Sequence, residues 1–116
     1  MIRKIIIYKT DFIEFYKEQD KKIQEKIEYV LDLVRYEKQV PIKFFKYLES
    51  TDGIFEIRII TTFKSIRILC FFDDGQLVVL TNGFIKKTDK TPSSEIKKAE
   101  KMKKDYFLDK NGGKRK

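Results

Sequence analysis

Two arginines interrupt apolar stretches of the sequence, and their spacing points to chemistry with an anion. Arg58 and Arg67 lie in the runs Ile54–Ile60 and Ile66–Phe72, which predict two strands joined by a four-residue loop. In such a hairpin the arginines are directly opposite each other on one face, with Cβ atoms roughly 5 Å apart. Because like charges placed in this way destabilise a sheet, we expect an anion or a carboxylate to meet them. Our interpretation is that the anion is an RNA phosphate.

A third apolar run, Leu77–Asn82, predicts a central strand that is followed by a basic segment containing Lys86 and Lys87. Arginines can neutralise the charge of a five-coordinate phosphorane, and a lysine crowded by other cations has a lowered pKa and can transfer protons. RNA carries its own nucleophile, the 2′-hydroxyl, so RNA cleavage is compatible with these groups. We therefore predict a catalytic group that consists of Arg58, Arg67, Lys86 and Lys87.

Each of these residues also has a purely structural explanation. Arg58 can form an ion pair with Glu56, which lies two residues earlier on the same face of the strand. Arg67 can donate hydrogen bonds to a chain terminus or to the last helix. Lys86 and Lys87 can be a solvated pair that follows a strand. The spacing alone leaves both interpretations open.

The residues that are missing exclude several kinds of enzyme. The chain has no histidine and a single cysteine, Cys70, so the common zinc sites and an internal disulfide are excluded. There is no glycine-rich phosphate loop, and the carboxylates fall at positions expected to face solvent, which argues against a two-metal nuclease. We therefore expect no metal and no cofactor. No apolar segment approaches the roughly 20 residues of a membrane span, and a buried thiol suits a reducing cytoplasm.

The positive charge is concentrated near the C-terminus. The net charge is +8, and residues 83–116 carry 12 basic residues against 5 acidic ones, whereas residues 1–82 carry 14 against 13. This asymmetry indicates a polyanionic partner, although a solvated lysine-rich helix would explain it equally. Lysines interleaved with aromatic residues in Ile42–Leu48 are typical of single-strand binders, unless those aromatics merely anchor a connector to the core. We assign RNA binding to Lys43, Lys46, Lys64, Lys90, Lys97, Lys98 and Lys101.

The remaining segments predict an α+β fold of one domain, residues 1–108, with a disordered basic tail over residues 109–116. A strand over Lys4–Tyr8 precedes a short helix and a longer helix capped by Asp20, whose apolar residues recur at helical spacing. We expect this N-terminal strand and helical hairpin to pack on a small, mainly antiparallel sheet. A C-terminal helix follows, with Thr91 at the N-cap and Pro92 at the first helical position.

Four motifs follow in order at characteristic distances and carry a resemblance to a known family. They are Gly53-Ile54-Phe55-Glu56-Ile57-Arg58, Ile66-Arg67-Ile68-Leu69, Asn82-Gly83-Phe84-Ile85-Lys86-Lys87-Thr88, and Thr91-Pro92 with Glu95-Ile96 and Ala99. The sequence resembles the RelE/ParE toxin superfamily, and in particular the HigB-like, phage-derived toxins of type II toxin–antitoxin systems. The resemblance extends from Ile2 to Tyr106, and its most specific part runs from Gly83 to Pro92.

The resemblance implies a RelE-like fold and a ribosome-dependent endoribonuclease that cuts mRNA in the decoding site. It also implies a cognate antitoxin, usually one with a helix-turn-helix DNA-binding domain. By position, Arg67 matches the phosphate-stabilising arginine of the family, Lys86 and Lys87 match its basic exit from the last strand, and Arg58 matches a recurrent basic position. The chain lacks the histidines of some HigB toxins and has Glu56 where related ribonucleases often carry lysine. The general acid and the general base are therefore unassigned.

Two other functions stay open at this point. A ParE-like gyrase poison uses the same fold without the ribonuclease residues, and would produce DNA double-strand breaks without mRNA cleavage. A non-catalytic nucleic-acid-binding regulatory module would bind in a salt-sensitive manner through the lysines of the last helix, without toxicity.

Overall fold

The computed structural model describes residues 1–112 of the chain, and residues 113–116 lie outside the described part. Within these residues five strands and three helices form an α+β arrangement. In chain order they are β1 (Lys4–Ile7), α1 (Asp11–Glu18), α2 (Lys21–Tyr36), β2 (Phe45–Tyr47), β3 (Phe55–Ile60), β4 (Ser65–Asp73), β5 (Leu77–Ile85) and α3 (Ser93–Gly112).

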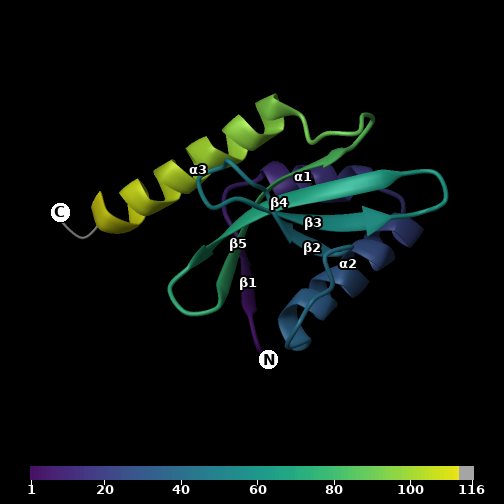
Figure 1. Cartoon of the computed structure of the whole chain (residues 1–116), viewed down its shortest axis with the longest axis horizontal. Coiled ribbons are helices and arrows are strands. Elements are labelled where there is room, and N and C mark those ends of the chain that lie inside the picture. Colours follow the sequence, from purple (N-terminus) through teal and green to yellow (C-terminus); the bar gives the residue numbers. More distant parts are fainter. Residues whose placement is uncertain (113–116) are drawn as a thin grey trace.

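The strands form one five-stranded sheet in the order β1-β5-β4-β3-β2 (Figure 1). β1 is parallel to β5, and all other neighbours are antiparallel, so the predicted, mainly antiparallel sheet is confirmed. The loop between β3 and β4 has four residues, Thr61–Lys64, and it places Arg58 directly opposite Arg67, as the sequence predicted. β5 continues three residues beyond the predicted end at Asn82, because Ile66 and Arg67 pair with Ile85 and Phe84.

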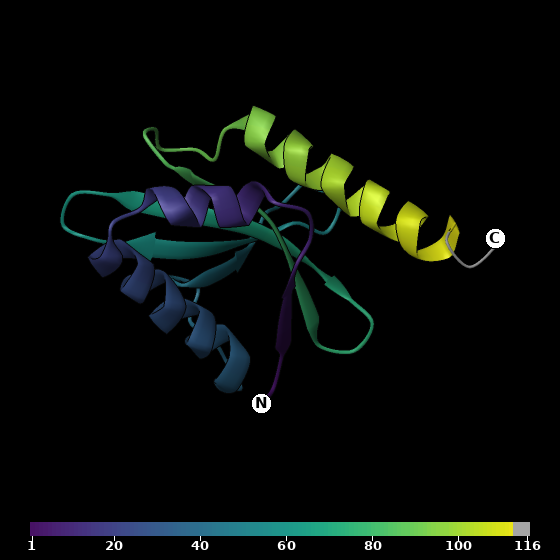
Figure 2. The same cartoon turned by 180° about the vertical axis from the view of Figure 1, so that it is seen from behind.

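The helices α1 and α2 cover one face of the sheet, as predicted for the helical hairpin (Figure 2). The side chain of Asp20 accepts a hydrogen bond from the amide of Ile23 at 2.9 Å and caps α2 as expected. The apolar stripe of α2 then packs on the strand residues that point toward it, which include Ile57, Ile59, Ile66 and Ile68. Burial of this apolar surface is the main force holding the hairpin on the sheet.

The third helix, α3, lies on the opposite face and completes a three-layered molecule (Figure 1). Ala99 and Tyr106 of α3 pack against Leu69, Phe71 and Val79 of the sheet. This is also the face that carries Arg67, since Arg67, Leu69 and Phe71 alternate with the residues under α1 and α2. The two arginines therefore share a layer with α3 rather than with the helical hairpin.

Both ends of α3 differ from the sequence prediction. The helix begins at Ser93, where the amides of Glu95 and Ile96 donate to the carbonyl of Pro92, so Thr91 is not its N-cap. At the other end α3 continues through Gly112, so residues 109–112, assigned to the tail, are helical. The rest of the predicted tail lies outside the described residues. None of the helices within residues 1–112 is long and apolar enough to cross a membrane.

Candidate functional site

A buried carboxylate lies between the two arginines. Oε1 of Glu56 is 3.3 Å from Nε of Arg58 and 3.2 Å from Nε of Arg67, and the Glu56 residue is only 2% exposed. The carboxylates were expected to face solvent, and for Glu56 that prediction is wrong. The ion pair between Arg58 and Glu56, offered above as a structural alternative, is present. Glu56, a residue of β3, thus stabilises the pair of like charges that Arg58 and Arg67 form across the hairpin.

The Arg67 guanidinium is fixed by the end of its own strand. Nη1 donates hydrogen bonds to Oγ of Ser65 at 2.9 Å and to the carbonyl of Ile66 at 3.1 Å, and Arg67 is 3% exposed. Burial lowers the pKa of Arg67, while the Glu56 carboxylate acts in the opposite direction. These contacts replace the predicted structural alternative, a hydrogen bond to a chain terminus or to the last helix. Arg67 is consequently held in one orientation before any ligand binds.

Both arginines keep unused hydrogen-bonding capacity. Within the described residues the Nε groups of Arg58 and Arg67 are buried and make no aligned hydrogen bond, although Glu56 lies within ion-pair distance. A buried donor without an aligned acceptor costs free energy, and here the charge of Glu56 offsets that cost.

The loop between β5 and α3 closes over the carboxylate. The Thr91 hydroxyl donates a hydrogen bond to Oε2 of Glu56, which explains why this residue does not cap α3. The buried Asn82 donates from its side-chain amide to Oε1 of Glu95 at 2.9 Å and so ties β5 to the first turn of α3. Asn82 lies in an irregular part of the β4–β5 pairing, between the pairs formed by Ile68 and Cys70. Such bulges redirect side chains, and here one directs an amide toward the helix.

Lys86 joins this cluster from the end of β5. The backbone amide of Lys86 donates to the carbonyl of Ser65 at 2.7 Å. Lys86 therefore lies beside the start of β4, where Ser65 is two residues before Arg67 on that strand. Burial lowers the pKa of Lys86, and the neighbouring charge of Arg67 lowers it further. Lys87, the next residue, is exposed. The structure thus brings Arg58, Arg67 and Lys86 to one end of the sheet around a single carboxylate; we call these three residues and Glu56 the Arg–Glu cluster.

The lysines predicted to bind RNA do not form one patch. Lys46 on the edge strand β2 is paired in register with Glu56, and Lys43 lies over the ring of Phe44 at 5.0 Å. Nζ of Lys64 is 3.5 Å from Oε1 of Gln19. On α3, Lys98 pairs with Asp11 at 2.9 Å and Lys101 with Asp105 at 3.2 Å, whereas Lys90 and Lys97 are simply exposed. Their assignment stays a prediction.

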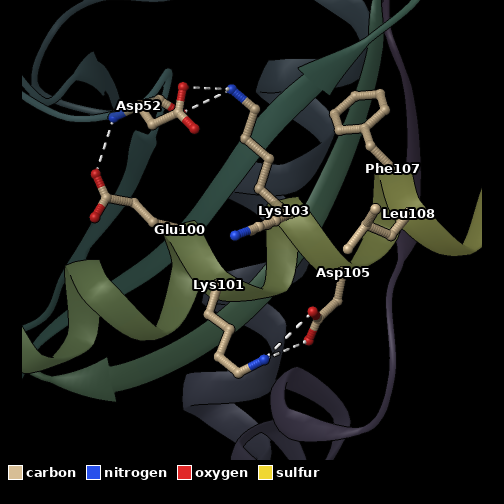
Figure 3. A pocket seen from close by; sticks show the side chains of 8 residues that line it. Asp52, Glu100, Lys101, Lys103, Asp105, Phe107 and Leu108 are labelled. Atoms are coloured by element: carbon tan, nitrogen blue, oxygen red, sulfur yellow. Dashed lines mark hydrogen bonds and ion pairs between the residues drawn. The ribbon is translucent and has the colours of Figure 1, made fainter.

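A separate hollow of about 770 Å³ lies on the outer side of α3 (Figure 3). Its charged side chains are engaged within the protein: Glu100 accepts from the backbone amide of Asp52 at 2.9 Å, and Lys103 donates to the backbone carbonyl of Asp52 at 2.7 Å. None of the predicted catalytic residues lines this hollow. Among the described residues there is also no group of three or more metal-ligating side chains.

Sequence reasoning offered Glu56 as a partner of Arg58 but missed its contact with Arg67 and its burial. It also missed the parts played by Ser65 and Thr91. The alternation of β3 places Glu56 beside Arg58, and this is the signal that could have identified it. The burial of Glu56 could not be predicted from the sequence, because it depends on Thr91, 35 residues further along the chain.

The three-layered fold and the basic cluster at the sheet end define a RelE-like α+β protein. The chain belongs to the family described as "Phage derived protein Gp49-like", a RelE/HigB-type toxin family whose model matches residues 14–104. Its fold is similar to a chain in the crystal structure of the archaeal RelE–RelB complex from Pyrococcus horikoshii OT3. That match has a TM-score of 0.52 and 17% identity, and it covers 78% of this chain and 100% of that one. No curated protein gives a significant match.

Proposed function

We propose that this toxin is a ribosome-dependent endoribonuclease that cleaves mRNA in the cytoplasm by attack of the 2′-hydroxyl on the adjacent phosphate. The observation that carries the proposal is the Arg–Glu cluster, in which two guanidinium groups contact one buried carboxylate and Lys86 lies close enough for their charges to act on its pKa. A second anion, the scissile phosphate, would offset part of the positive charge that Glu56 leaves uncompensated. Membership of a RelE/HigB-type toxin family agrees with this chemistry.

In this mechanism the 2′-hydroxyl gives up its proton and its oxygen forms a bond to phosphorus. The bond between phosphorus and the 5′-oxygen of the next nucleotide breaks, and that oxygen takes up a proton to become a hydroxyl. Arg67 and Arg58 stabilise the doubly charged phosphorane, because preorganised cations act most strongly where charge develops. Lys86 is our candidate for proton transfer, because its pKa is lowered from the usual lysine value toward neutral pH. Lys87 holds the RNA backbone. Glu56 stays buried and positions the two guanidinium groups.

We further propose that a cognate antitoxin, of the helix-turn-helix type, neutralises the toxin. The structural neighbour was crystallised as a RelE–RelB complex, which supports an antitoxin partner. The basic exit segment of this chain is a suitable surface for an acidic antitoxin segment.

The proposal is tested by replacing Arg67 and Arg58 and measuring mRNA cleavage on programmed ribosomes together with growth arrest. We expect Arg67→Ala and Arg58→Ala to lower cleavage by roughly 10² to 10³, the usual loss when one transition-state donor is removed. Arg35→Ala is the matched control, because Arg35 is a surface arginine that pairs with Asp32 on α2. Circular dichroism of each variant establishes that it is folded.

Parent-like cleavage by folded Arg67→Ala and Arg58→Ala proteins would contradict the proposal. DNA double-strand breaks without mRNA cleavage would identify a gyrase poison instead. Salt-sensitive nucleic-acid binding with neither effect would identify a non-catalytic regulatory module.

A further inference from the structure

Two hollows on the α2 side of the molecule share one lysine. The first, of about 260 Å³, is lined by Lys26, Lys43, Phe44 and Arg58, among others. The second, of about 510 Å³, is lined by Lys22, Lys26 and Phe63 together with the start of α2. Because Lys26 lines both, the two hollows adjoin, one beside Arg58 and the other beside the tip of the β3–β4 hairpin. The hairpin loop and the beginning of α2 lie side by side at this end (Figures 1 and 2).

This surface exists because β2 is short. β2 pairs with residues Phe55–Ile57 of β3, and the amide of Arg58 still donates to the carbonyl of Phe44 at 2.8 Å. Within the described residues, the edge of β3 beyond Arg58 has no neighbouring strand. Arg58 can therefore line a hollow on the α2 side while its Nε contacts Glu56 on the α3 side. Arg58 is the link between the Arg–Glu cluster and this second surface.

The surface is basic. Within residues 1–112 no acidic side chain lies within ion-pair distance of Lys22, Lys26 or Lys43, unlike Lys98, Lys101, Lys103 and Lys110 of α3. The acidic group that lines it, Asp20, is engaged in capping α2. Arg58 is paired with Glu56, but a polyanion on this surface would meet three lysines that no carboxylate of the described residues neutralises.

The surface also presents an aromatic ring. Phe63 is 93% exposed at the hairpin tip, where an apolar side chain gains nothing from the fold. Its loop is nevertheless well defined: the amide of Thr61 donates to the carbonyl of Lys64 at 2.8 Å, and the amide of Lys64 donates to Oγ1 of Thr61 at 3.0 Å. Aromatic rings held out beside lysines are the usual means of stacking single-stranded bases while binding the backbone.

We propose that this surface is a single-stranded RNA track that leads the substrate to the Arg–Glu cluster. In this track a nucleobase stacks on Phe63 and the phosphates lie along the three lysines, Lys22, Lys26 and Lys43. The RNA strand then enters the reaction site at Arg58. The track rests on the proposed ribonuclease function and adds to it residues of α2 and of the hairpin tip. It consists of Lys22, Lys26, Lys43, Phe44, Arg58 and Phe63.

The test is binding of a fluorescein-labelled, fully 2′-O-methylated RNA octamer, which cannot be cleaved because its nucleophile is blocked. We expect Phe63→Ala to raise Kd at least roughly 5-fold, whereas Phe63→Tyr keeps the ring and binds within about twofold of the parent. Lys26→Gln should reduce the slope of log K against log salt by roughly 0.7, the value for one phosphate contact in a single strand. The matched control is Tyr36→Ala, an aromatic residue that is 59% exposed at the far end of α2.

Parent-like affinity and salt slope of the Phe63→Ala and Lys26→Gln variants would overturn the track. So would a Phe63→Ala protein that binds the octamer normally but no longer binds the antitoxin, because the surface would then recognise a protein. The binding measurement is independent of catalysis. If Arg67→Ala cleaves mRNA like the parent, the proposed cleavage mechanism is wrong. The effects of Phe63→Ala and Lys26→Gln on octamer binding would still decide whether the track exists.

Discussion

At the scale of single residues, the site is organised by Glu56. Its carboxylate contacts both arginines and accepts from Thr91, so one buried side chain connects β3, β4 and the loop that precedes α3. A buried ion pair contributes little net stability, but removing one partner leaves the other charges unpaired. We therefore assign Glu56 a positioning role, in which it keeps the guanidinium groups in place for the phosphate.

Replacing Glu56 by glutamine should destabilise the protein by roughly 3 kcal/mol, because two buried guanidinium groups lose their counter-charge. Phosphate should then raise the melting temperature of Glu56→Gln more than that of the parent, since it supplies the missing anion. Differential scanning calorimetry with and without phosphate measures both effects, and Glu49→Gln at an exposed position is the control. Equal phosphate effects on both proteins would mean that Glu56 does not occupy a site for anions.

At the scale of secondary-structure elements, α3 is held to the sheet by polar contacts at its C-terminal end. The buried carboxylate of Asp73 accepts from Tyr106 at 2.6 Å and from Lys110 at 2.9 Å. These hydrogen bonds lower the pKa of Asp73 to about 2, the contact with Lys110 having the largest effect. They also explain why α3 continues beyond the predicted boundary at residue 108.

The contact of Asp73 with α3 should make stability depend on pH in the acidic range. The folded protein has the lower pKa, so the stabilisation is fully present above about pH 4 and is lost as the pH falls toward 2. The expected loss is on the order of 2 kcal/mol. Urea unfolding at pH 5 and at pH 2.5 measures it, with Asp73→Asn as the comparison. An Asp73→Asn protein whose stability falls with acid as steeply as that of the parent would show that other carboxylates are responsible.

A close approach between α1 and β5 gives a second prediction about the elements. A Cβ added at Gly83 would lie 2.7 Å from the Phe15 ring, which is closer than such atoms normally come. Gly83→Ala should therefore lower stability by roughly 1–3 kcal/mol, the cost typical of overpacking, in thermal unfolding. Combining it with Phe15→Leu should recover part of the loss; no recovery would place the strain elsewhere.

At the scale of the whole molecule, local patterns predicted most of the fold. The four-residue loop fixed the register of β3 and β4, and Asp20 marked the start of α2. The parts that could not be predicted depend on contacts between distant segments. Burial of Glu56 requires Thr91, and the length of α3 depends on Asp73. The basic surface on α2 could not be predicted either. In the sequence Lys22 and Lys26 are typical solvated helix lysines, and only the folded structure places the hairpin tip beside them.

The distribution of charge over the molecule is likewise different from its distribution along the sequence. Much of the C-terminal excess lies on α3, where Lys98, Lys103 and Lys110 are paired with Asp11, Asp52 and Asp73. Lys22 and Lys26 of α2 lie in residues 1–82, where the basic and acidic residues nearly balance. The surface that we propose for RNA thus follows from the fold rather than from composition.

The most direct test of the central claim uses an mRNA that carries a single 2′-deoxynucleotide at the cleavage position, presented on programmed ribosomes. If the 2′-hydroxyl is the nucleophile, the purified protein cuts the all-ribose mRNA to a 2′,3′-cyclic phosphate and a 5′-hydroxyl and leaves the substituted mRNA intact at that position. Cleavage of the 2′-deoxy substrate at the same position, or products with a 3′-hydroxyl and a 5′-phosphate, would contradict the mechanism.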